Sequence, residues 1–301
     1  MEINSTNLNL FHKRETSIQK QNPERKSYDE LTMMDSFLFE SATEKPENAT
    51  TISKIIIERS TGRKVKKLVV ETQKELKGFT INNHGIRIDV YTTEVDKNIE
   101  NAETTCVYDI EPNNYRESDI PRRNRYYQSL VDSKLLPTNT PYEKLPDMLS
   151  IWLLPYDPFG DDRMIYTVKN KVEENNQIVY NDGVTKLFLY TKGSKGGSQK
   201  LKELLTFMEN PCRDNAADDE LLKILDIIDT VKSNPKERER YMGIMGVIDY
   251  EKRDAFEAGE IKGAIDTCKF LKLDKEKTKH AIIMQFSLTE DTAEDYLNLY
   301  W

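Results

Sequence analysis

Apolar positions recur along this chain with two different periods, and the period changes near residue 192. Before that point, short runs of alternating or continuous apolar residues predict β-strands. The expected strands are Val65–Val70, Ile86–Tyr91, Thr105–Ile110, Met148–Pro155, Met164–Val168, Gln177–Tyr180 and Val184–Tyr190. Met148–Pro155 is almost uninterruptedly apolar, which predicts a strand buried on both faces.

Helical spacing lies on both sides of these strands and once between them. The stretches Leu31–Phe39, Ile52–Glu58 and Ile120–Leu136 are expected to be helical, and Pro121 suits a first helical turn. The polar stretch Thr93–Glu103 predicts a hairpin loop, and Asn-Asp-Gly at 181–183 predicts a turn. After residue 198 we expect only helices, at about 199–209, 217–232, 236–253, 255–271, 274–286 and 289–299.

These patterns divide the chain into four parts. Residues 1–30 are polar without a sustained apolar period, which predicts a flexible arm. Residues 31–192 predict an α/β domain, and the Gly- and Ser-rich residues 193–198 predict a flexible hinge. Residues 199–301 predict an all-helical C-terminal module.

The composition is apolar enough for a hydrophobic core, and its negative net charge limits the positive charge available for binding nucleic acid. Hydrophobic residues make up 37% of the chain, charged residues 32%, and the formal net charge is −8. A nucleic-acid-binding protein with this balance must concentrate its cations locally. Residues 51–77 do so, and a second group is Arg122, Arg123 and Arg125. Such runs are also common on plain solvated surfaces, so both interpretations stay open.

Cysteine usage and hydropathy bear on location. The three cysteines are far apart and form no CxxC or Cys/His spacing, so neither a disulfide framework nor a zinc site is indicated. No stretch approaches the roughly 18 apolar residues that span a bilayer. We therefore expect a soluble, cytoplasmic protein without a membrane partner.

The richest candidate chemistry lies between Gly85 and Asn113. Asp89 stands inside one expected strand and Glu111 at the end of the next, so a hairpin would bring both carboxylates to one rim. Two such oxygen donors suit Mg²⁺ or Mn²⁺. The usual work of such a site is to activate water against a phosphodiester. Asp109 shares the strand with Glu111, and we expect it to form a hydrogen bond at the strand end rather than bind metal.

Neighbouring residues supply further roles for the same chemistry. Asn113 would project beside Glu111 and orient water, and Arg123 on the following helix would contact a phosphate. Arg125 belongs to the same basic group, and Tyr127 would stack on a base or pack the helix. Purely structural roles for these residues remain open, because lone acids, a surface arginine and a core tyrosine are common in proteins of this size.

A series of motifs in fixed order resembles a known family. The segments are Asp35–Ala49, Gly85–Tyr91, Tyr108–Asn113, Arg122–Asp132, Tyr142–Gly160 and Met164–Asn170. Together they resemble the PD-(D/E)XK nuclease family transposases, relatives of the recombination-promoting nucleases. The resemblance covers about Asp35 to Lys192, and in looser form the helical tail.

The resemblance implies a restriction-endonuclease-like fold, a mixed central sheet flanked by helices, with Mg²⁺-dependent DNA cleavage. Asp89 falls on the family's metal-binding Asp and Glu111 on its (D/E) position. Asn113 falls where the superfamily usually has Lys and this family often Gln. The resemblance also places Arg123 and Tyr127 in its Arg/Tyr-rich helix.

A further acid from the first helix would be either Asp35 or Glu40. Two departures from the family pattern stand out: Asn113 carries no positive charge, and Pro112 implies a sheet edge or a strand end.

The sequence thus favours a metal-dependent DNA endonuclease of mobile-element or genome-defence type. The main alternative is a catalytically weak or inactive nucleic-acid-binding protein on the same scaffold, which Asn113 and the acidic net charge favour. A third hypothesis is a helical adaptor built around the C-terminal module. Homodimerisation through that module stays open under each of them.

Overall fold

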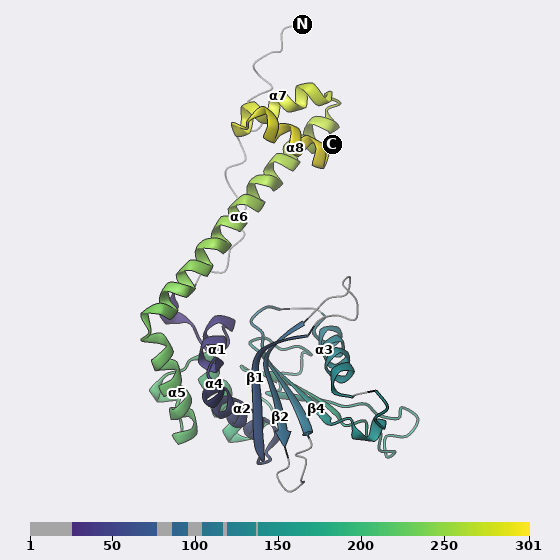
Figure 1. The fold of residues 1–301 in the computed structure, drawn as a ribbon, viewed down its shortest axis with the longest axis vertical. Helices are drawn as coiled ribbons and strands as arrows, with labels where there is room; N and C mark the ends of the chain where they lie inside the picture. The colour runs from purple at the N-terminus through teal and green to yellow at the C-terminus, as the bar shows by residue number, and fades with distance from the viewer. Residues whose placement is uncertain (1–25, 77–85, 96–103, 117–118, 137) are drawn as a thin grey trace. The chain divides into compact units, whose positions relative to one another are not determined.

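The computed structural model describes residues 26–76, 86–95, 104–116, 119–136 and 138–301. They form a six-stranded mixed sheet with helices on both faces, followed by a helical C-terminal region (Figure 1). The expected fold class, a mixed α/β sheet flanked by helices and followed by an all-helical module, is therefore confirmed. The chain divides into two compact units, one ending at Asn234 and one beginning at Pro235.

The sheet joins an antiparallel half to a parallel half in the order β1-β2-β3-β4-β6-β5. The first three strands form an antiparallel meander, β3, β4 and β6 are parallel, and β5 is antiparallel to β6. The strands are β1 Lys67–Leu76, β2 Ile86–Val95, β3 Thr104–Pro112, β4 Asp147–Leu154, β5 Ile165–Val168 and β6 Val184–Tyr190. A parallel pair needs a crossover, and α3 (Ile120–Leu135) supplies it between β3 and β4.

The apolar runs predict the central strands well. Every residue of β4 after Asp147 is buried, as its continuous apolar sequence predicts. The strand expected at Gln177–Tyr180 is wrong, because these residues pair with no described strand and Val179 is 84% exposed. Of the expected hairpin loop, residues 93–95 belong to β2, and residues 96–103 lie outside the described residues.

Helices cover the two faces of the sheet unequally. Among the described helices, α3 covers one face, whereas α1 (Ser36–Thr43) and α2 (Pro46–Thr61) lie on the other (Figure 1). Pro46 opens α2 at the position where its missing N–H costs nothing, and Gly62 ends it in the left-handed conformation with φ +72°.

The first two C-terminal helices belong to the sheet domain. α4 (Gln199–Glu209) and α5 (Asp219–Lys232) pack against α1 and α2. The Arg59 side chain, 2% exposed, joins α2 to the start of α5 through two hydrogen bonds to Asp218, at 2.6 and 2.7 Å. The division between compact units therefore falls after Asn234 rather than at the expected hinge 193–198. Burial of apolar side chains on α4 and α5 accounts for the difference.

The end of the expected flexible arm is also part of this domain. Residues 1–25 lie outside the described residues. Tyr28, however, stands in a short 3₁₀ turn, is 2% exposed, and donates a hydrogen bond from its hydroxyl to the Val231 carbonyl oxygen at 2.9 Å. The prediction of a flexible arm is therefore wrong for the residues around Tyr28, because burial of this aromatic ring fixes them against α5.

The C-terminal unit contains three helices around a small apolar core. They are α6 (Pro235–Phe270), α7 (Lys275–Phe286) and α8 (Glu290–Tyr300). The core consists of Ile261, Ile265, Ile282, Ala293 and Leu297. α6 is one helix where the sequence predicted two, since neither a proline nor a capping glycine interrupts residues 251–256. Within the described residues, no helix combines the length and apolar character needed to cross a bilayer.

The Arg59 ion pair should contribute measurably to the stability of the sheet domain. Arg59→Ala removes the buried guanidinium that bridges Asp218 and Glu220, so we expect the free energy of unfolding to fall by about 2 kcal/mol. Urea unfolding measures this change. The matched control is Lys223→Ala, which removes an exposed cation from α5. Equal stability of the two variants would mean that Arg59 does not anchor α5.

Candidate active site

Two predicted site acids become neighbours where the β2–β3 ladder ends. Register pairs continue along β2 and β3 as far as Val90 opposite Ile110. Beyond that pair, the Asp89 backbone N–H donates a hydrogen bond to the Glu111 carboxylate at 3.0 Å. Glu111 itself stays in register with Trp152 of β4. Asp89 is 9% exposed and Glu111 3%, so both acids lie in the protein interior.

Asp109 adds a third buried acid that the sequence did not single out as a ligand. It stands opposite Tyr91 on β2 and two residues before Glu111, so it faces the α3 side of the sheet. It is completely buried, and a side-chain hydrogen bond with Glu111 holds its pKa down against the effect of burial. This agrees with the hydrogen bond expected for it at the strand end. We call Asp89, Asp109 and Glu111 the carboxylate cluster.

Burial dominates the electrostatics of this cluster. Removal from water raises the pKa of Asp89 to about 6, and the nearby Glu40 carboxylate acts in the same direction. Burial likewise raises the pKa of Asp109 and raises that of Glu111 well above its usual value, and the other two acids add to the effect on Glu111. The Arg123 guanidinium opposes the rise of the pKa at all three acids.

Gln73 on β1 stands between the residues paired with Val90 and Ile88, opposite Asp89, and its side-chain hydrogen bond lowers the pKa of Asp89. Other polar atoms near the cluster are buried without hydrogen-bond partners. They are both side-chain amide atoms of Asn124 on α3 and the indole N–H of Trp152. Native interiors satisfy nearly all such groups, so a concentration of them indicates a missing polar or ionic partner.

The α3 helix brings one cation toward the cluster. Arg123 donates hydrogen bonds to the Tyr127 hydroxyl at 2.9 and 3.2 Å, and its guanidinium lies 5.2 Å from the centre of the Trp152 ring. Tyr127 is 7% exposed and packs its ring against Trp152. Tyr127 therefore holds Arg123 and fills the core rather than offering a face to a base. Arg125, by contrast, lies on the exposed side of α3.

Asn113 lies just beyond the cluster and fixes a turn. Its backbone N–H extends the β3–β4 ladder to the Leu153 carbonyl oxygen at 2.9 Å. Its side-chain oxygen accepts a hydrogen bond from the Tyr115 N–H at 2.8 Å. Pro112 is the last residue of β3, as expected for a strand end, although β3 is a central strand of the sheet and not an edge.

The two acids considered on the first helix have different surroundings. Asp35 accepts hydrogen bonds from Thr32 and from the Asn114 side-chain amide, so its carboxylate organises a turn. Glu40 forms an ion pair with Arg87 at 2.7 Å and raises the pKa of Asp89. Of the two, Glu40 is the one that acts on the carboxylate cluster.

The donor chemistry of the cluster fits a hard divalent cation. Among the residues that the structure describes, no three His, Cys, Asp or Glu side chains form a ready metal-binding group. The Glu111 carboxylate instead accepts the Asp89 N–H and forms a side-chain hydrogen bond with Asp109. Carboxylate oxygens alone select Mg²⁺ or Mn²⁺ over softer metals. The residues that would hold the ion are Asp89 and Glu111.

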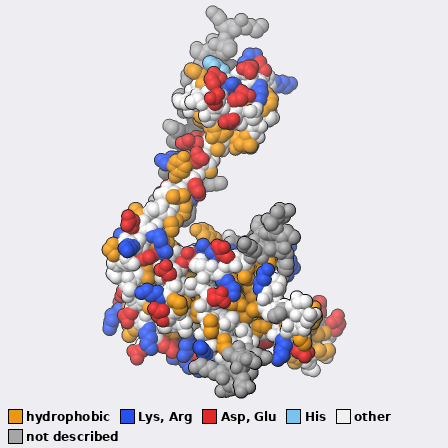
Figure 2. Space-filling view, in the orientation of Figure 1, with side chains coloured by type: hydrophobic (Ala, Val, Ile, Leu, Met, Phe, Trp, Pro, Cys, Tyr) orange, Lys and Arg blue, Asp and Glu red, His pale blue; other side chains and the backbone are white. Residues whose placement is uncertain are grey.

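Several cations of the basic run at 51–77 are paired with acids, although most of its described cations lie on the surface. Arg59, Arg63, Lys64 and Lys74 each form an ion pair with a carboxylate, and Lys77 lies outside the described residues. Figure 2 shows Lys and Arg side chains interspersed with Asp and Glu on the visible face of the sheet domain. This run therefore supports local structure more than a basic binding surface.

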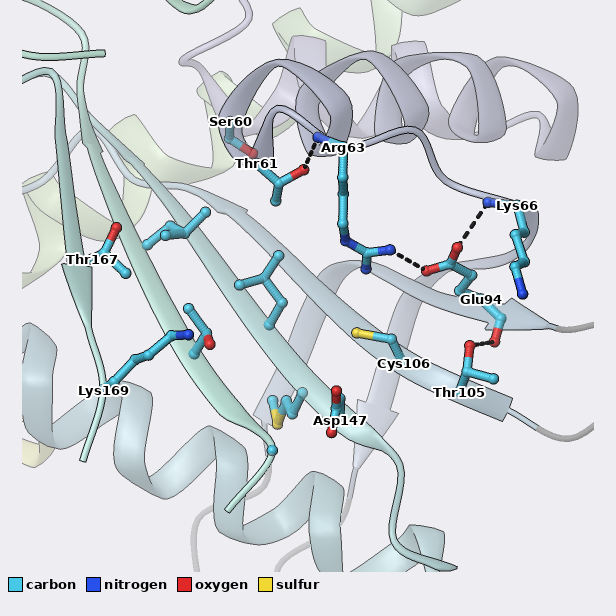
Figure 3. A pocket seen from close by; sticks show the side chains of 15 residues that line it. Ser60, Thr61, Arg63, Lys66, Glu94, Thr105, Cys106, Asp147, Thr167 and Lys169 are labelled. Atoms are coloured by element: carbon cyan, nitrogen blue, oxygen red, sulfur yellow. Dashed lines mark hydrogen bonds and ion pairs between the residues drawn. The ribbon is translucent and has the colours of Figure 1, made fainter. Parts of the chain in front are cut away.

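A pocket of about 530 Å³ near the other ends of β3, β4 and β6 was missed by the sequence analysis (Figure 3). Its best-organised group is Glu94, which accepts hydrogen bonds from the Lys66 N–H at 2.8 Å, Arg63 at 3.1 Å and the Tyr108 hydroxyl at 2.6 Å. Strand alternation places Glu94 on the same side of β2 as Val90. This alternation is the one sequence feature that could have predicted an inward-facing Glu94.

Comparison with protein-family models, curated proteins and solved structures found no match to this chain. Its function is therefore inferred from the chemistry of the site and from the sequence resemblance.

The carboxylate cluster should make the protein less stable as the pH rises. A carboxyl group whose pKa is raised by folding holds its proton more tightly in the folded chain, so stability falls as the pH rises from the unfolded to the folded pKa. Between about pH 5 and about pH 7, we expect the free energy of unfolding to fall by more than about 1 kcal/mol. Carboxylates with lowered pKa, such as Asp157 and Glu94, have finished titrating below this range.

Urea unfolding across this pH range, without divalent cations, checks the expectation. Glu111→Gln removes one member of the cluster and should flatten the decline. Glu143→Gln, which changes an exposed carboxylate, should leave it unchanged. A stability that rises with pH in this range, or an identical slope in all three proteins, would contradict the assigned pKa shifts.

Proposed function

We propose that this chain is a divalent-cation-dependent DNA endonuclease that hydrolyses phosphodiester bonds, of the mobile-element or genome-defence type. The observation that carries the proposal is the hydrogen bond between the Asp89 backbone and the Glu111 carboxylate at the end of the β2–β3 ladder. It makes two acids from neighbouring strands adjacent, in the positions where the resembling family binds metal. Buried, unpartnered polar groups around them support a site that receives an ion.

Each residue near the cluster has a role in this proposal. Asp89 and Glu111 would hold the cation. A bound Mg²⁺ or Mn²⁺ supplies a Lewis acid and lowers the pKa of water. Arg123 provides the positive charge that attracts and orients a phosphate, and Tyr127 keeps its guanidinium in place. Glu40 adds negative charge beside Asp89, which favours cation binding.

The surroundings of Asn113 modify the role expected for it. Its side-chain oxygen holds the turn after β3, so it positions the chain beside Glu111, and it supplies no positive charge. A site with Asn in place of Lys stabilises the charge of the phosphoryl transition state less well. We therefore propose a slow enzyme with Arg123 as the main cation. DNA would approach over α3, where Arg122 and Arg125 are exposed.

A catalytically silent DNA-binding protein is the second candidate function. The observation that favours it is the turn made by Asn113, which uses the side-chain oxygen expected to orient water. This candidate predicts salt-sensitive retention of DNA, with no cutting in either Mg²⁺ or Mn²⁺. DNA retention without cutting in either metal would leave the endonuclease proposal without support.

The remaining expectations concern partners and location. α6 exposes apolar side chains on several sides, among them Met242, Val247, Tyr250 and Phe256, which is unusual for a solvated helix. We propose that a second copy of the chain covers them.

All three cysteines are unpaired, which agrees with a reducing compartment, and we propose that the protein is located in the cytoplasm.

Removal of Asp89 should abolish cleavage. We expect Asp89→Ala to lose cation-dependent nicking of supercoiled plasmid DNA while its circular dichroism spectrum stays that of the folded parent. Asp226→Ala, a change at an exposed carboxylate on α5, is the control and should cut at the parental rate. Equal cutting by the Asp89 variant and the parent would remove the assignment.

The two arginines of α3 should separate chemistry from binding. Arg123→Ala removes the charge beside the cluster, so we expect the single-turnover cleavage rate to fall by about 100-fold. Arg125→Ala removes an exposed charge, so we expect weaker DNA binding with the cleavage rate at saturating DNA nearly unchanged. If both variants lose only DNA affinity, Arg123 has no part in the chemical step.

A further inference from the structure

Gln73 stands inside β1 with a backbone conformation that regular strands do not contain. Its φ is +52°, in the left-handed region. Among the residues that the structure describes, it is the only non-glycine residue within a strand that has a positive φ. A Cβ makes this conformation costly, so it persists only where surrounding contacts enforce it. Strain of this kind concentrates at functional sites.

The strained residue lies directly opposite Asp89. The residues on either side of Gln73 keep one register with β2, in the pairs Thr72–Val90 and Lys74–Ile88. Gln73 and Asp89 stand between these pairs and do not pair regularly. β2 is irregular at the same point, because Ile88 and Tyr91 pack in one core cluster although a regular strand would point them to opposite faces. Both strands therefore depart from regular geometry at the candidate ligand.

The side chain of Gln73 gives a reason for this departure. Both of its polar atoms are buried, and it forms a hydrogen bond with the Asp89 carboxylate. Burial raises the pKa of Asp89, and this hydrogen bond opposes the rise. An ionised carboxylate only accepts hydrogen bonds, so the Gln73 amide N–H is the donor. The Asp89 backbone N–H in turn donates to the Glu111 carboxylate at 3.0 Å, which links all three residues.

A neutral amide suits this position better than a charged donor. Asp89 already feels the charges of Glu40, Arg87 and Arg123. An amide orients a carboxylate and leaves its negative charge available, whereas a further Lys or Arg would compete with a bound cation for that charge. Hydrogen bonds to a ligating carboxylate are a common means by which proteins fix the orientation of a metal ligand.

We infer that Gln73 is a positioning residue of the candidate active site, which holds the Asp89 carboxylate in the orientation that binds the cation together with Glu111. The inference rests on the proposed function and extends it, since neither the family resemblance nor the strand pattern singles out Gln73. The left-handed backbone at residue 73 turns the amide toward Asp89, and the hydrogen bond offsets part of the strain.

Replacement of Gln73 should change the cation requirement of cleavage. Gly and Asn both adopt the left-handed conformation readily, but Gly has no amide and the Asn amide is one methylene too short to reach Asp89. For Gln73→Gly we expect the Mg²⁺ concentration at half-maximal cleavage to rise about 10- to 100-fold. At saturating Mg²⁺ the rate should approach that of the parent. Single-turnover nicking of supercoiled plasmid by the full chain, measured across a Mg²⁺ series, checks this.

The Mg²⁺ series also separates the possible failures. Lys67→Gly, which removes an exposed side chain from the start of β1, is the control and should keep the parental Mg²⁺ requirement. A Gln73→Gly variant with the parental requirement, or with a lower rate at every Mg²⁺ concentration, would overturn the positioning role and leave the endonuclease proposal standing. A parent that cuts in neither Mg²⁺ nor Mn²⁺ would overturn both. If Gln73→Gly does not fold, Gln73→Asn carries the same expected shift and the same contradicting results.

Discussion

Burial of three acids at the end of the β2–β3 ladder is the constraint on which the account of this protein depends. The β2–β3 meander brings Asp89 next to Glu111, and alternation along β3 adds Asp109 on the α3 side. All three acids are buried, and burial raises the pKa of each of them. A core built for stability alone would place apolar residues there.

The rest of the sheet domain supports this arrangement. The β3–α3–β4 crossover carries Arg123 back over the strand that bears Glu111, and Tyr127 and Trp152 determine where its guanidinium lies. On the opposite face, α1 supplies Glu40, and Arg59 joins α2 to α5. Burial of the three acids is unfavourable, and the apolar packing of the central strands on both faces of the sheet offsets that cost.

The periodicity of apolar residues predicted the strands that carry the site. The features it missed depend on tertiary packing between residues distant in sequence. Alternation in residues 86–91 and 105–110 located β2 and β3, and with them the adjacency of Asp89 and Glu111. It missed the complete burial of Asp109, because the sequence does not show how closely a fold covers one strand. Tyr28 and Arg59 were missed as anchors since their partners, Val231 and Asp218, are distant in sequence. The strand expected at 177–180 shows that a short apolar run does not determine its own pairing.

The central claim is that the carboxylate cluster is a binding site for a divalent cation, and anomalous scattering tests it most directly. Crystals of the full chain grown with Mn²⁺ would be measured near the manganese absorption edge. The account predicts an anomalous peak at ligand distance from the Asp89 and Glu111 carboxylates. A peak elsewhere, or well-ordered cluster side chains with no peak at a saturating Mn²⁺ concentration, would contradict it.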